Sequence, residues 1–177
     1  TLLNFFGTGE NQINIPVAII TDSDPKKVTS SGNDWKDTDG RENAIPARDT
    51  NGEIIPCDRI ATLKTLISSK TNAQLFTSSV TLEYDLAFAN KELASLMAKA
   101  WEAFYIRKGS AVLNSATMAV KASDEERALF AWREICLSCA MVNKAEFAHE
   151  LAFLISVEAH MTPPKYLVDA INFVCKK

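Results

Sequence analysis

The stretch INIPVAIITDSDP, residues 13–25, decides the fold class of this 177-residue chain. Its short, apolar and β-branched run at 17–20 is typical of a strand buried on both faces of a parallel sheet. Two carboxylates, Asp22 and Asp24, follow the run directly. On an extended backbone, residues two apart point the same way, so we expect both carboxylates at one site. That site would lie at the carboxyl end of the strand, where open α/β sheets bind their ligands.

The segments that follow continue an α/β pattern and then become helical. Residues 25–56 are polar and contain turn signals, among them the Asn51-Gly52 pair, which predicts a small hairpin. Residues 57–70 have helical spacing and residues 73–82 predict a second strand, so the order strand, helix, strand indicates a parallel crossover. The later pattern predicts a long helix over 85–106, a capping-box helix from Ser123 to about Met141, a third helix over 143–159, and a last one after Pro163-Pro164.

Composition and charge exclude several classes of protein. Apolar residues make up 47% and charged residues 23% of the chain, which is typical of a soluble globular protein. No apolar run reaches the ~20 residues of a membrane span, so we expect a cytoplasmic protein without a membrane partner. The net charge of −3 argues against a broad basic surface for DNA phosphates. Acidic side chains can still serve locally as metal ligands.

The four cysteines do not indicate a zinc site. Cys136 and Cys139 form a C-x-x-C, but it lies within an apolar helical stretch. The two histidines, His149 and His160, are too far apart in sequence for the finger-like spacing of ~3–5 residues. Buried free thiols in a reducing compartment are the better interpretation.

A second acidic pair follows the second predicted strand. Glu83 and Asp85 lie in TLEYDLA, residues 81–87, at the same spacing of two. These residues also suit the N-terminal cap and first turn of a helix, and both interpretations remain open. If the pair lies beside Asp22 and Asp24 at the ends of adjacent parallel strands, the four carboxylates make a plausible site for two Mg²⁺ or Mn²⁺ ions.

Three segments carry a resemblance to a known family. In order, they are IPVAIITDSDP (15–25), TLEYDLA (81–87) and KAEFAHELA (144–152). Together they resemble the C-terminal Toprim region of the OLD (overcoming lysogenization defect) family of ATP-dependent endonucleases. The resemblance implies an α/β fold with a Toprim-like parallel sheet, flanking helices and a helical insertion. We expect a partial domain, because no segment resembles the family's earlier V-E-G strand or its P-loop ATPase domain. The expected parts are a sheet-bearing part at 1–85, a helical insertion at 86–141, and C-terminal helices at 142–177 that pack back on the sheet.

The resemblance also implies a function and a set of site residues. The chain would be a fragment of a metal-dependent DNA endonuclease, with two Mg²⁺ or Mn²⁺ ions promoting phosphodiester hydrolysis. Asp22 and Asp24 would be metal ligands, Glu83 would complete the metal site, and Asp85 would be a fourth acid at that site. Lys144 would neutralise charge in the transition state, so the implied catalytic set is Asp22, Glu83 and Lys144. The implied partners are DNA, the ATPase domain through which ATP would act, and a second copy of the chain.

Two other interpretations are kept open. The chain could be a non-catalytic interaction or dimerisation module of an ATPase-associated protein, with purely structural acids. It could also be a D-x-D phosphatase in which Asp22 is the nucleophile. Lys26 occupies the position where D-x-D-x-[TV] requires Thr or Val, which counts against the phosphatase.

Overall fold

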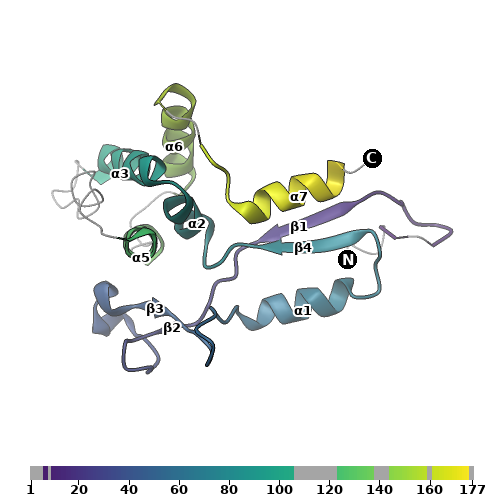
Figure 1. The fold of residues 1–177 in the computed structure, drawn as a ribbon, viewed down its shortest axis with the longest axis horizontal. Helices are drawn as coiled ribbons and strands as arrows, with labels where there is room; N and C mark the ends of the chain where they lie inside the picture. Colours follow the sequence, from purple (N-terminus) through teal and green to yellow (C-terminus); the bar gives the residue numbers. More distant parts are fainter. Residues whose placement is uncertain (1–5, 8, 106–122, 138–143, 159–160, 176–177) are drawn as a thin grey trace.

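A parallel pair of strands lies between two helices and positions the candidate site (Figure 1). The computed structural model describes residues 6–7, 9–105, 123–137, 144–158 and 161–175. Strand β1 (Val17–Thr21) pairs with β4 (Ala73–Thr77) in parallel, with Val17 opposite Ala73 and Thr21 opposite Thr77. Figure 1 shows α7 (Lys165–Cys175) along one face of this pair and α1 (Asp58–Ile67) along the other. The predicted mixed α/β class with a parallel crossover is confirmed.

The predicted burial of β1 on both faces is wrong in part. Ile20 is 50% exposed, although it belongs to the apolar run. Only β4 pairs with β1 among the described residues, so the strand lacks the neighbours that enclose a central strand of a larger parallel sheet. Helix α7 packs on both strands, with the ring of Phe173 5.8 Å from that of Phe76 on β4.

The polar segment between β1 and α1 contains short elements. Strand β2 (Lys27–Val28) pairs antiparallel with β3 (Ile45–Pro46), and two 3-10 turns, Asp37–Asp39 and Arg41–Asn43, lie between them. The predicted Asn-Gly turn is present, because an antiparallel bridge joins Arg48 to Ile54 across it. Gly52 has φ of +83°, a conformation that residues with a Cβ rarely adopt.

The single long helix predicted over 85–106 is wrong, because it divides at Asn90. Helix α2 (Leu82–Ala89) ends there and α3 (Lys91–Tyr105) begins directly afterwards. Asn90 is extended, with φ of −142° and ψ of 111°. Its side chain donates to the backbone oxygen of Thr162 (2.8 Å) and accepts from the backbone nitrogen of Thr162 (3.0 Å). These two tertiary hydrogen bonds help to compensate for the interrupted helix, and nothing near Asn90 in the sequence indicates them.

The main core lies among the helices rather than under the sheet. Helix α5 (Asp124–Cys136) packs on α2, and α6 (Lys144–Glu158) packs on α3. The capping box predicted at Ser123 is confirmed, since Ser123 and Glu126 exchange two hydrogen bonds of 3.1 Å. The expected end of that helix at Met141 lies outside the described residues. The largest fully buried side chains of this core are Trp101, Trp132, Leu93, Met97 and Ile135.

The C-terminal helices take two different places. Helix α7 packs on β1 and β4, whereas α6 packs chiefly against α3. The rings of Trp101 and Phe147 meet edge to face, with centroids 6.1 Å apart, and so fix α6 on the helical core. Within the described residues, no helix is both long and apolar enough to cross a membrane.

Candidate functional site

Asp22 is held at the carboxyl end of the parallel pair. It directly follows β1, and its Oδ1 accepts hydrogen bonds from Ser78 Oγ (3.1 Å) and the backbone nitrogen of Leu82 (3.0 Å). Ser78 directly follows β4, and Leu82 is the first residue of α2. The Asp22 carboxylate therefore joins both strand ends to the N-terminus of α2, where the helix dipole favours a negative charge.

Asp24 does not continue the extended backbone that its spacing predicts. Its φ is +41°, so the chain turns at this residue. The expectation that Asp22 and Asp24 point the same way assumed an extended backbone, and that assumption is wrong. The Asp24 carboxylate pairs with Arg59 of α1 at 2.9 Å. The same guanidinium nitrogen donates to the backbone oxygen of Asp22 at 3.3 Å. Asp22 thus contacts α2, and Asp24 contacts α1.

Glu83 and Lys144 meet across two helices. Glu83 lies in the first turn of α2, and Lys144 is the first residue of α6. Lys144 Nζ is 3.5 Å from Glu83 Oε1. The Glu83 side chain is 15% exposed and the Lys144 side chain 55% exposed, so the pair borders solvent. Two residues from separate sequence motifs are brought together here.

Asp85 is buried and points differently from Glu83. Residues two apart on a helix lie on different faces, and α2 begins at Leu82. Thr81 caps this helix by accepting from the backbone nitrogen of Tyr84, so the capping interpretation of TLEYD is confirmed. Asp85 Oδ2 accepts from the backbone nitrogen of Ser79 at 2.9 Å.

The ionisation of Asp22 and that of Asp85 are opposed by burial and by neighbouring carboxylates. Burial raises the pKa of Asp22, and the charges of Glu83 and Asp24 raise it further, while the hydrogen bonds from Ser78 and Leu82 lower it. Burial also raises the pKa of Asp85, and the charge of Asp22 adds to that rise. A cation at this edge would relieve the repulsion between these carboxylates.

The four predicted ligands do not form a closed metal cage. Among the described residues, no three Asp, Glu, His or Cys side chains are grouped so that they could hold a metal ion together. Asp24 pairs with Arg59, and Asp85 with the backbone of Ser79. The donor chemistry still suits Mg²⁺ or Mn²⁺, because Mg²⁺ is commonly bound by one or two carboxylates together with water and substrate phosphates. The geometry therefore fits an open site better than a cage.

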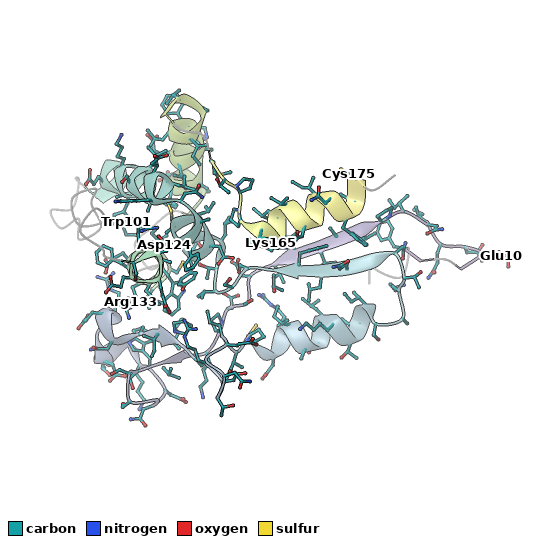
Figure 2. All side chains as sticks on the ribbon, in the orientation of Figure 1. Glu10, Trp101, Asp124, Arg133, Lys165 and Cys175 are labelled. Carbon is teal, nitrogen blue, oxygen red and sulfur yellow. The ribbon has the colours of Figure 1, made fainter. Side chains whose placement is uncertain are left out.

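Tyr166 also lies at this edge, although no motif in the sequence indicates it. It lies in the first turn of α7, whose N-terminal end carries Lys165 and faces α2 in Figure 2. Burial raises the pKa of Tyr166, and the charges of Asp22, Asp85 and Glu83 raise it further. The Pro163-Pro164 signal predicts where α7 begins, but no local pattern indicates that α7 would place this phenol beside the acids.

Cys136 also adjoins the acidic edge. Its Sγ is 3.6 Å from Thr81 Oγ1. Burial raises the pKa of the Cys136 thiol to about 12, and the charge of Glu83 contributes to that rise. Cys136 is a free thiol, and its C-x-x-C partner Cys139 lies outside the described residues. A thiol kept protonated in this way is a poor metal ligand.

Comparison with known proteins identifies no relative of this chain. No family model matches the chain. No curated protein and no solved structure matches it significantly either. The interpretation of the site therefore rests on its own residues and their geometry.

Proposed function

We propose that this chain is the Toprim-like part of an OLD-type DNA endonuclease that hydrolyses phosphodiester bonds with Mg²⁺ or Mn²⁺. The observation that carries the proposal is the meeting of Glu83 with Lys144, 3.5 Å apart, at the strand ends where Asp22 is held. An acid whose ionisation is disfavoured by burial, close to a second carboxylate and a lysine, suits a site that binds a divalent cation and a phosphate.

Each residue has a distinct part in this proposal. Asp22 is fixed through Oδ1, and among the described residues its Oδ2 has no hydrogen-bond partner, so this oxygen can face an ion. Glu83, in the first turn of α2 next to Leu82, offers a second carboxylate. A divalent ion bound there would supply a nucleophilic water and charge stabilisation. Lys144 places an ammonium where negative charge grows on the phosphate.

The proposal extends to partners that the chain does not itself contain. DNA is the proposed substrate, and an ATPase domain in a longer chain is the proposed partner through which ATP acts. We also propose a cytoplasmic location and homodimer formation. The excess of acidic over basic groups implies that this chain holds DNA weakly without such partners.

Nicking of supercoiled plasmid by the purified chain tests the proposal. We expect slow nicking, faster with Mn²⁺ than with Mg²⁺ and abolished by EDTA. Asp22→Asn and Lys144→Ala should each reduce the rate by about 10²-fold or more. Lys91→Ala is the matched control, because Lys91 is likewise exposed and is the first residue of a helix, α3. It should leave the rate unchanged.

Binding of Mn²⁺ gives a second readout that does not depend on cleavage. Mn²⁺ should raise the melting temperature of the wild-type chain, because a ligand that binds only the folded state stabilises it. The rise should be lost in Asp22→Asn. A chain that neither gains stability from Mn²⁺ nor nicks plasmid would contradict the nuclease proposal and favour the interaction module with structural acids.

A further inference from the structure

A pocket adjoins the acidic edge between α2 and the start of α7. Its volume is about 460 Å³, within the ~300–1,000 Å³ typical of small-molecule sites. Phe88 of α2 lines it, together with Pro164 and Tyr166 from the start of α7. The hydrogen bonds between Asn90 and Thr162 tie the end of α2 to the segment before α7, so the two walls of the pocket are joined.

Phe88 presents an aromatic surface that is held in place. Its ring is stacked on that of Tyr84, with centroids 6.2 Å apart and planes 14° apart. Tyr84 is 3% exposed, so one partner of the stack is anchored in the core. Phe88 itself is 45% exposed and lines the pocket. A further flat ring laid on Phe88 would extend the stack.

The polar groups of the pocket select against an anion. Asp85 lines it and is oriented by its hydrogen bond from the backbone nitrogen of Ser79. Lys165, the one cation of the lining among the described residues, is paired with Asp169. Asp85 can accept a hydrogen bond from an N–H group, but it repels a phosphate. The chemistry therefore fits a neutral, flat ring that carries N–H donors.

Tyr166 connects the pocket to the acidic edge. It lines the pocket together with Thr77 and Ser79, and Ser78 between them donates to Asp22 Oδ1 at the acidic edge. A ligand with a flat ring in the pocket and a phosphate beside Lys144 would span both parts. A nucleotide within a DNA strand has this construction.

We propose that this pocket binds an unpaired nucleobase of the DNA substrate, an inference that rests on the proposed nuclease function and names its substrate class. A base enters such a pocket only when it is unstacked and unpaired. The chain therefore prefers single-stranded or locally opened DNA to intact duplex, and stacking on Phe88 supplies much of the affinity.

Fluorescence of 2-aminopurine within a single-stranded oligonucleotide tests the inference. The titration uses the full chain at low salt in EDTA, so that neither metal binding nor cleavage contributes. Stacking in the pocket should change the fluorescence, and the matched duplex should bind at least tenfold more weakly. Phe88→Ala should weaken single-strand binding by roughly tenfold or more, in line with the loss of one stacked base.

Two further variants make the test decisive. Phe153→Ala is the matched control, because Phe153 is another exposed phenylalanine, 57% exposed on α6, and it should bind like the wild type. Ala89→Gln keeps Phe88 but fills part of the pocket from an exposed position at the end of α2, and it should also weaken binding. If Phe88→Ala fails to fold by circular dichroism, Ala89→Gln decides the outcome.

The outcomes separate this inference from the nuclease proposal. Unchanged affinity in the folded Phe88→Ala or Ala89→Gln chain, or equal affinity for duplex, would overturn the base pocket even if metal-dependent nicking persists. The same is true if the wild-type chain does not bind the oligonucleotide. Base binding in EDTA that depends on the pocket supports the inference. If the chain then shows neither nicking nor stabilisation by Mn²⁺, the nuclease proposal is contradicted and the base pocket is retained.

Discussion

Replacement of Ser78 by alanine should destabilise the chain and disturb Asp22 at the same time. Ser78 is 1% exposed, and its hydroxyl connects two parts of the acidic edge. Ser78 Oγ donates to Asp22 Oδ1 at 3.1 Å and accepts from the backbone nitrogen of Ser23 at 3.3 Å. The bond between Ser23 Oγ and the backbone oxygen of Ser78 does not involve the deleted hydroxyl and is retained.

The size of the effect follows from these two hydrogen bonds. Without the hydroxyl, the buried backbone nitrogen of Ser23 loses its partner, which costs about 1–3 kcal/mol. Asp22 is only half-buried, so water can replace the second bond and its loss costs about 1 kcal/mol. The free energy of unfolding should therefore fall by roughly 2–4 kcal/mol. In a chain of this size, that fall corresponds to a melting temperature lower by roughly 4–16 °C.

Thermal unfolding and carboxyl NMR measure the two consequences. The pKa of Asp22 should rise in Ser78→Ala, because the hydrogen bond from Ser78 lowers it in the wild type. Ser30→Ala is the control, since Ser30 is exposed, and it should change stability by less than about 0.5 kcal/mol. A Ser78→Ala chain with wild-type stability and an unshifted Asp22 pKa would refute the assigned role of this hydroxyl.

Two further predictions concern ionisation at the same edge. Asp22→Asn should raise the free energy of unfolding at neutral pH, because burial in the folded state raises the pKa of Asp22 and therefore disfavours its charge. Protonated Asp22 stabilises the folded state at pH values below its ordinary pKa of 3.8, and this contribution is lost as the pH rises through the folded-state pKa. The free energies of unfolding of the wild type and of Asp22→Asn should therefore converge at low pH. The thiol of Cys136 should react with iodoacetamide at pH 8 far more slowly than that of exposed Cys175, because the pKa of Cys136 is raised to about 12. Peptide mass mapping measures both rates, and comparable alkylation in the folded chain would contradict the buried, protonated thiol.

Local interactions allowed much of the secondary structure to be predicted. The β-branched run at 17–20 forms β1, because such side chains favour an extended backbone. The capping box at Ser123 and the turn at Gly52 also form as predicted. In each case, the residues that stabilise the element lie within a few positions of one another in the sequence. Short sequence patterns are therefore enough to predict these elements.

The candidate site was predictable in part. Asp22, Glu83 and Lys144 come from three separate segments. The order of the two strands suggested that Asp22 and Glu83 meet at the strand ends, whereas only the resemblance to the OLD family implied that Lys144 lies near them. Glu83 and Lys144 do meet, 3.5 Å apart. The orientation of Asp24 was not predictable, because a left-handed backbone and a pairing with Arg59 of α1 determine it. Sequence spacing predicts the directions of side chains only on a regular strand, and β1 ends at Thr21, before Asp22 and Asp24.

Only the tertiary structure decided where helices break and which side chains gather in the pocket. Local helix propensity favours continuation through Asn90, yet hydrogen bonds to Thr162, distant in sequence, compensate for the interruption there. Docking of α7 on the sheet brings Tyr166 beside acids that precede it by many residues. Such contacts depend on the packing of whole elements, whose free energy is shared among many side chains. Sequence therefore determined which elements form and which acids this chain presents, whereas packing determined how those acids are paired and what surrounds them.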